Sequence, residues 1–292
     1  MAARPPAFSE RAALLGMVAA TLLWGGTFIV TRDALPGVTV PALMLARFGV
    51  AALILGVTAA LSRRRLSRLT LTGGLLCAPF IYACYALQAE GLRETTAGSS
   101  AFLTCAGTLA APFFAWLLLR QRPSTAVFLG MGLALAGSLL LSWRQGMGFG
   151  RAETLTFAGS IAYAFQLVIV ARLAPEVDPL VLTAVQSVGV ALCALPFASP
   201  RAAVAALTGA GIAPRTLYLA LAGSTVAPLL QVAAQRSLTT GRIAILFALE
   251  PVFALIFAAT IGGERFVLRW WIGAGLILAA VVIAERGAAA EA

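Results

Sequence analysis

The 292-residue chain contains no histidine and no lysine, and only 11% of its residues are charged. Without histidine, metal ligation and acid–base catalysis by imidazole are excluded. All 21 basic residues are arginine, and the formal net charge is +10. These arginines gather in short segments between long apolar runs, a distribution that orients membrane proteins. We therefore expect lipid around the chain and no nucleic-acid partner.

Hydrophobic residues make up 61% of the chain, far above the range of soluble globular proteins. Only four cysteines occur, and none has the paired spacing of a metal site or a disulfide framework. The sequence also lacks a glycine-rich phosphate-binding loop with lysine. We expect no metal, no cofactor and no ATPase or other enzymatic activity. The cysteines are predicted to be small core residues: Cys77, Cys84, Cys105 and Cys193.

Apolar runs of roughly 18 to 22 residues with few charges predict membrane-spanning helices. Ten such runs occur, so the chain is predicted to be an all-α integral membrane protein with ten transmembrane helices. The first run has no clear cleavage site and is predicted to be an uncleaved helix rather than a secretory signal. The predicted spans are residues 12–31, 41–61, 70–89, 96–119, 125–143, 154–171, 179–197, 216–235, 243–261 and 270–284.

The second half of the chain repeats the first at an offset of 143 residues, without a gap. Examples are the pairs Gln88/Gln231, Arg93/Arg236, Thr96/Thr239, Phe114/Phe257, Gly130/Gly273 and Gly132/Gly275. A unit of five spans is odd-numbered, so the second copy must cross the bilayer in the opposite direction. We predict two inverted five-helix repeats, residues 1–143 (helices 1 to 5) and 144–292 (helices 6 to 10), with a binding site between them near the midplane.

Loop arginines predict the orientation. In the first half, eight arginines lie at the N-terminus and in the second and fourth loops, against two in the first and third loops. Because arginine is enriched on the cytoplasmic side, both termini are predicted to be cytoplasmic. The bias almost vanishes in the second half, so the first half is expected to set the topology.

Several short motifs resemble a known family. They are the runs 23–28 (LWGGTF), 46–48 (ARF), 249–253 (LEPVF), 263–265 (GER) and 273–275 (GAG). Their order, spacing and ten-span duplication resemble the drug/metabolite transporter superfamily in its EamA-type ten-helix branch. The nearest likeness is to bacterial aromatic amino acid exporters. The resemblance implies alternating access around a central cavity, a small-molecule substrate and a place in the bacterial cytoplasmic (inner) membrane.

The first repeat departs from this pattern at three positions. Gly107 stands opposite Glu250, Thr108 opposite Pro251 and Gln121 opposite Glu264. A mechanism that needs a symmetric pair of carboxylates is therefore not expected.

Polar and aromatic side chains that lipid would not select recur on single faces of several predicted helices. Converged in a bundle, these faces would form an aromatic box with amide and hydroxyl groups, suited to a partly apolar, zwitterionic solute. Alternatively, the aromatic residues belong to the membrane interface and the polar ones hold helices together. The candidate substrate-binding residues are Trp24, Phe28, Tyr82, Tyr85, Gln88, Thr104, Tyr163, Gln166, Gln231 and Glu250.

Charges inside the spans are the most unusual feature. Glu250, near the middle of the predicted ninth helix, costs roughly 2.5 to 3.5 kcal/mol on insertion scales, so it must face a cavity, find a partner or be protonated. A proton-coupling role and a structural hydrogen bond both fit. Arg47 is interpreted as a structural or gating partner. Glu90 and Arg93, three residues apart, are predicted to form an ion pair at a helix end.

Four prolines fall in the helices with most of the polar faces, where proline breaks a helix or acts as a hinge: Pro79, Pro112, Pro228 and Pro251. Together these features predict a secondary transporter that exports small metabolites, most directly amino acids including aromatic ones. The alternatives are an exporter of drugs or other metabolites, and, with less support, a membrane enzyme or a channel.

Overall fold

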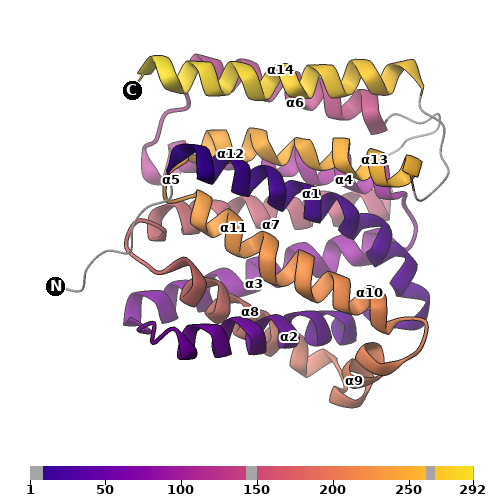
Figure 1. The fold of residues 1–292 in the computed structure, drawn as a ribbon. Helices are drawn as coiled ribbons and strands as arrows, with labels where there is room; N and C mark the ends of the chain where they lie inside the picture. The colour runs from indigo at the N-terminus through magenta and orange to yellow at the C-terminus, as the bar shows by residue number, and fades with distance from the viewer. Residues whose placement is uncertain (1–8, 143–149, 261–266, 292) are drawn as a thin grey trace.

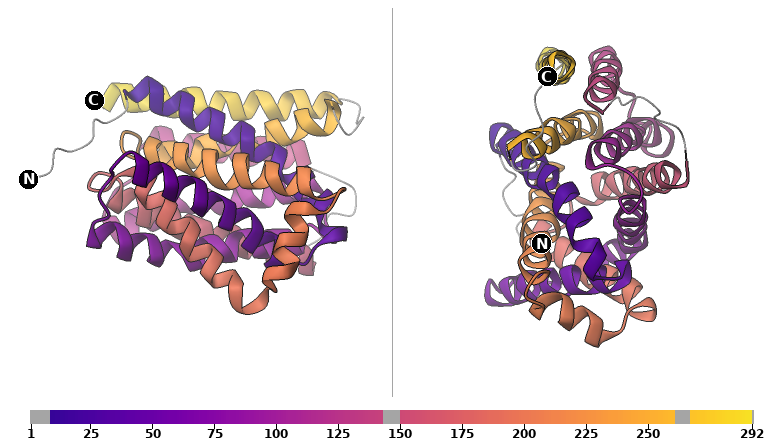
Figure 2. Two further views of the ribbon diagram at one scale, coloured as in Figure 1. Left: turned by 60° about the horizontal axis from the view of Figure 1, so that its bottom comes forward. Right: turned by 90° about the vertical axis from the view of Figure 1, so that its right-hand side faces the viewer.

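The computed structural model describes residues 9–142, 150–260 and 267–291, and every regular element in these ranges is a helix. The long helices lie side by side in one bundle, seen along their length in Figure 1 and nearly end-on in the right-hand view of Figure 2. Glu264, which the sequence places in a loop, lies outside the described residues.

Ten transmembrane segments make up the bundle, as predicted. Nine helical segments are long and apolar enough to cross a membrane, and the shorter apolar helix α6 is the tenth. The first repeat contains α1 (Glu10–Ala34), α2 (Val40–Leu61), α3 (Arg68–Gly91), α4 (Ala97–Thr108) continued by α5 (Ala111–Leu119), and α6 (Thr125–Ser142). The second contains α7 (Arg151–Leu173), α8 (Pro179–Ala194), α10 (Ala213–Tyr218) continued by η3 (Leu219–Val226) and α11 (Ala227–Ala234), α12 (Thr240–Phe247) continued by α13 (Leu249–Thr260), and α14 (Leu268–Glu291).

Three short helices lie outside these spans. The 3₁₀ turns η1 (Leu35–Gly37) and η2 (Leu195–Phe197) follow α1 and α8. The helix α9 (Pro200–Thr208) packs against α2 and α10 through Ala203 and Ala206, and the sequence-based assignment did not include it. It is nine residues long, too short to cross a bilayer.

The two repeats begin their fourth helices in the same way. The Thr96 hydroxyl accepts a hydrogen bond from the Ser99 N–H at the start of α4, and the Thr239 hydroxyl accepts one from the Arg242 N–H at the start of α12. Each threonine satisfies a backbone donor that the first helical turn leaves free. The caps lie 143 residues apart, so the sequence repeat is also a structural repeat.

Helix contacts between the halves also come in matched pairs. The third helix, α3, packs on α7 and α8, and its counterpart, the segment α10–η3–α11, packs on α1 and α2. Likewise α4 packs on α7, and α13 packs on α1. The pairs α2–α8 and α6–α14 map onto themselves and lie at opposite edges of the bundle (Figure 1). This is the contact pattern of two inverted repeats.

Three of the four prolines stand at helix breaks. Pro112 lies in the first turn of α5 and Pro251 in the first turn of α13, where a missing N–H costs no helical hydrogen bond. Pro228 lies in the first turn of α11, which directly continues η3, so its missing N–H leaves a carbonyl of η3 without a helical partner. Pro79 does not interrupt α3, contrary to the prediction, because the helix runs unbroken from Arg68 to Gly91. One lost hydrogen bond does not end a 24-residue helix that packs on α7 and α8.

Glycines bring α6 and α14 together. A Cβ atom added to Gly137 would meet the Gly273 carbonyl oxygen at 2.5 Å and Ile277 Cγ1 at 2.8 Å. Gly130 and Gly273 are similarly crowded, whereas an added Cβ on Gly132 or Gly275 would have nothing within 4 Å.

We predict that Gly137→Leu destabilises the protein by about 1–3 kcal/mol, because the side chain has no room at the α6–α14 crossing. Gly132→Leu, on the open face of the same helix, is the matched control and should leave stability unchanged. Thermal unfolding of the purified proteins in detergent measures both. Equal unfolding temperatures for the two variants would contradict this packing.

Candidate functional site

A cavity lies between the two repeats at the centre of the bundle. Seven of the ten predicted substrate-binding residues line it, and they come from α1, α3, α4, α7 and α13. The cavity is lined by Trp24, Thr27, Phe28, Cys84, Tyr85, Gln88, Thr104, Tyr163, Phe247 and Glu250.

Aromatic rings supply half of the residues in the cavity wall. The Trp24 indole stacks on Phe247, with ring centroids 5.2 Å apart, and meets Tyr163 edge-on at 6.2 Å. Tyr163 makes further edge-on contacts with Tyr85 at 6.4 Å and Phe247 at 5.7 Å. Sequence reasoning did not include Phe247, although it lies three residues before Glu250 on the same stretch of chain.

A break in helix geometry fixes two of these rings. In η3 the backbone is π-helical, so each N–H pairs with the carbonyl five residues earlier, as Ala227 does with Ala222. The next residue is Pro228, which has no N–H to give to the Gly223 carbonyl. That carbonyl instead accepts the Trp24 indole N–H at 3.0 Å and the Tyr85 hydroxyl at 3.2 Å. Because Pro228 lacks an N–H, the Gly223 carbonyl can accept the hydrogen bonds that position Trp24 and Tyr85 in the cavity wall.

Arg47 supports the same wall from behind. Its side chain is 1% exposed, its Nε donates to the Ser224 hydroxyl at 2.7 Å, and its guanidinium lies 4.6 Å from the centroid of the Tyr85 ring. Its Nη2 atom has no hydrogen-bond partner among the described residues, and it lies against Gly223, where an added Cβ would be 2.8 Å away. Arg47 therefore holds α2 to η3 and does not line the cavity.

A second, polar cavity adjoins the first, with an empty volume of about 270 Å³. Tyr85 and Tyr163 line both cavities and separate them. The predicted residues Gln166 and Gln231 lie here, and the Tyr163 hydroxyl donates to Gln231 Oε1 at 3.2 Å. Gln231 in turn donates to Gln235, whose amide donates to the Leu167 carbonyl at 2.8 Å.

The tenth predicted residue, Tyr82, lines neither of these two cavities. It is partly buried and packs at the edge of the core. Its neighbour Tyr85, one helical turn further along α3, takes the position against Trp24 and Tyr163. A three-residue stripe on a helix covers a wide arc, so sequence spacing alone does not decide which of its members reaches the centre.

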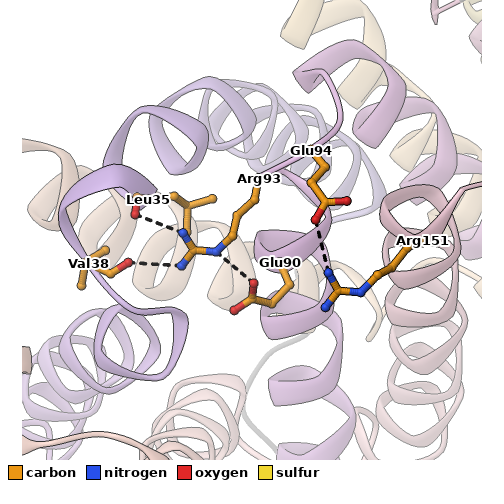
Figure 3. A network of polar contacts seen from close by, with 6 residues as sticks. All are labelled: Leu35, Val38, Glu90, Arg93, Glu94 and Arg151. Atoms are coloured by element: carbon orange, nitrogen blue, oxygen red, sulfur yellow. Dashed lines mark hydrogen bonds and ion pairs between the residues drawn. The ribbon is translucent and has the colours of Figure 1, made fainter.

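The end of the bundle at which α3 finishes is held together by polar contacts (Figure 3). Arg93 donates to the Leu35 and Val38 carbonyls, both at 3.3 Å, and pairs with Glu90 at 2.9 Å, as predicted. Beside it, Glu94 pairs with Arg151 at 3.2 Å, which joins the start of the second repeat to the first. These contacts tie the α1–α2 connection to α3 and α7.

The opposite end of the bundle contains a wide recess instead. Its empty volume is about 1300 Å³, and Arg122, Arg236 and Arg242 are among the residues that line it. Arg242 pairs with Glu10 at 2.6 Å and with Glu285, so the start of α12 is joined to α1 and α14. A smaller recess, with Asp33, Gly37 and Arg215 in its lining, lies at the Arg93 end, so the two ends are hollowed to different extents.

Comparison with known proteins identifies the chain. The EamA-like transporter family matches twice, over residues 11–143 and 150–285. The chain belongs to this family. An uncharacterized transporter of Archaeoglobus fulgidus is 26% identical over 269 residues, which cover 92% of this chain and 84% of that protein. A solved structure, described only as the crystal structure of a protein, superposes with a TM-score of 0.74 at 19% identity and covers 94% of this chain and 97% of its own.

Membership in the EamA-like family makes the chain an integral membrane transporter for a small molecule. The two family matches coincide with the two five-helix repeats, and the central cavity lies between them. That is where inverted-repeat transporters bind their substrates.

We predict that Tyr85→Phe lowers transport and reduces stability by about 1 kcal/mol, because it removes the hydroxyl that bonds to Gly223 while keeping the ring. Tyr82→Phe is the matched control on the same helix and should behave like the parent. Uptake into proteoliposomes and thermal unfolding are the measurements. If both variants behave alike, the Gly223 carbonyl does not organise the cavity.

Proposed function

We propose that this EamA-like transporter exports small metabolites, most directly amino acids with an aromatic or large apolar side chain, by alternating access around the central cavity. The observation that carries the proposal is the composition of the cavity wall: five aromatic rings together with Gln88, Thr104 and Glu250. Rings contribute about 0.5–1.5 kcal/mol per stacked pair beyond area burial, which favours aromatic solutes without binding them tightly. A carrier must release its solute, so weak binding suits it.

The unequal ends of the bundle support alternating access. The contacts of Arg93 and Glu94 close one end, and the recess beside Arg236 opens the other. Because the first-half arginines favour cytoplasmic termini, we place the recess on the cytoplasmic side and the Arg93 contacts on the outside of the inner membrane. In this orientation the cavity loads from the cytoplasm and discharges outward when the Arg93 contacts open.

A proteoliposome screen of labelled amino acids, with and without a pH gradient, tests the function. Saturable uptake that is accelerated by the same solute on the opposite side identifies a carrier, whereas unsaturated flux identifies a channel. Absence of saturable transport for every amino acid tried would contradict the amino acid part of the proposal.

We predict that Tyr163→Ala reduces transport of phenylalanine and tryptophan more than transport of alanine or threonine, because the lost ring face contacts only large apolar side chains. Tyr82→Ala removes a ring outside the cavity and serves as the control. Competition assays in proteoliposomes give the selectivity ratio. An equal loss for all solutes would mean that Tyr163 is needed for folding and not for selection.

We predict that Arg93→Ala opens the outer end, because it removes three hydrogen bonds at once. In a variant without native cysteines, Gln88→Cys in the cavity should then react faster with a membrane-impermeant thiol reagent added from outside. Arg32→Ala, which removes only the exposed pair with Asp33, should leave the rate unchanged. Equal labelling rates in both backgrounds would argue against an Arg93 gate.

A further inference from the structure

Most hydrogen-bond donors in the wall of the central cavity are already bonded to other groups of the protein, whereas acceptor oxygens remain available. The Trp24 N–H and the Tyr85 O–H are given to the Gly223 carbonyl, the Thr27 hydroxyl to the Trp24 carbonyl at 2.7 Å, and the Tyr163 hydroxyl to Gln231. Each of these donors is therefore engaged by the protein itself.

Gln88 follows the same pattern. Its amide nitrogen donates one of its two N–H groups to the Thr104 hydroxyl at 2.9 Å, and its carbonyl oxygen can accept a hydrogen bond from a solute. For a solute group that only accepts, the wall offers the second Gln88 N–H and the Thr104 hydroxyl, but no cation. A solute group that is rich in N–H donors fits the Gln88 carbonyl oxygen.

Among the described residues, Glu250 is the only charged one that lines the cavity, and its side chain is 3% exposed. No described residue forms an ion pair or a hydrogen bond with its carboxylate. The side chains that interact with it electrostatically are thiols and phenols, none of which carries a positive charge: Cys84, Tyr85, Cys105 and Tyr163. A buried carboxylate needs a partner, and here the protein does not supply a cation.

Arg47 does not fill that role. Arg47 is a buried cation, but its guanidinium lies behind Tyr85, is bonded to Ser224 and is not part of the cavity lining. A solute carboxylate in the cavity would therefore meet Glu250 and ring faces without a cationic partner. Like charges and the negative faces of aromatic rings both disfavour an anion there.

We infer that the group recognised in the central cavity is an ammonium, bound by Glu250 and the Gln88 carbonyl and surrounded by the faces of Trp24, Tyr163 and Phe247. Aromatic rings attract cations through their quadrupole, and a nearby carboxylate adds to this attraction. The substrate class is thus an organic amine with an aromatic or large apolar body, and a free carboxylate is not part of what the site recognises. This inference rests on the proposed transport function.

Three solutes that share an indole ring and a two-carbon chain test it: tryptamine, tryptophan and indole-3-propionate. At neutral pH they carry an ammonium, both charges and a carboxylate, respectively. Binding to the purified full-length protein in lipid nanodiscs gives their relative affinities. We expect tryptamine to bind about tenfold or more tightly than indole-3-propionate, with tryptophan between them.

Glu250→Gln should remove that preference by weakening tryptamine binding about tenfold while leaving indole-3-propionate unchanged. Glu176→Gln, which removes an exposed carboxylate paired with Arg172, is the control and should keep the parental order. Glu250→Asp keeps the charge and should retain the preference for tryptamine. If Glu250→Gln fails to fold, the order of the three solutes on the parent protein decides alone.

The outcomes separate this inference from the proposed function. If tryptophan is transported but indole-3-propionate binds as tightly as tryptamine, the ammonium inference is overturned and the carrier proposal stands. If Glu250→Gln keeps the preference, the charge of Glu250 is not the recognition element and the inference is likewise overturned. If neither amines nor amino acids are transported in the proteoliposome screen, the proposed function itself fails.

Discussion

The cavity depends on a single backbone carbonyl that has no partner within its own helix. Pro228 follows a π-helical turn and leaves the Gly223 oxygen unpaired in a segment where water is scarce, so a side chain must satisfy it. Trp24 from α1 and Tyr85 from α3 both do so, and Arg47 packs behind Tyr85 from α2. Helices of the first repeat are thereby fastened to the broken helix of the second. The same hydrogen bonds that join the repeats also engage the Trp24 and Tyr85 donors of the cavity wall, and no cation lines the cavity beside the Glu250 carboxylate.

The two repeats share a scaffold but contribute unequally to the site. Thr96 and Thr239 cap equivalent helices, and the contacts of α3 with α7 and α8 are matched by those of the α10–η3–α11 segment with α1 and α2. The helix breaks are less symmetric. The position that matches Pro112 in the second repeat is Leu255, and Pro251 lies four residues before it. The carboxylate Glu250 comes from the second repeat only. In the proposed alternating access, a symmetric frame with an asymmetric site would let two similar halves rock against each other around one fixed charge.

The charged contacts also differ between the two ends of the bundle. At one end, Arg93 and Glu94 bind the α1–α2 connection and Arg151, through contacts that are part-exposed and individually weak. At the other end, a recess with several arginines is held by Arg242 between α1 and α14. Between them lies the buried acid. Contacts of about 1 kcal/mol or less can be broken and remade in a transport cycle, whereas the buried anchor at Gly223 must persist.

The sequence by itself determined the membrane class, the ten helices, the five-plus-five repeat and the family, because hydrophobic length and a gapless offset can be read along the chain without knowing how its helices pack. It also placed nine of ten candidate residues in one of two adjoining cavities, since polar residues inside a membrane helix face its protein neighbours. Only the tertiary structure decided that Tyr85 and not Tyr82 reaches the centre, that Phe247 completes the wall, that Pro79 leaves its helix intact and that Arg47 lies outside the cavity. These outcomes depend on helix rotation and on which backbone carbonyl lacks a partner, and both are set by packing between segments more than a hundred residues apart.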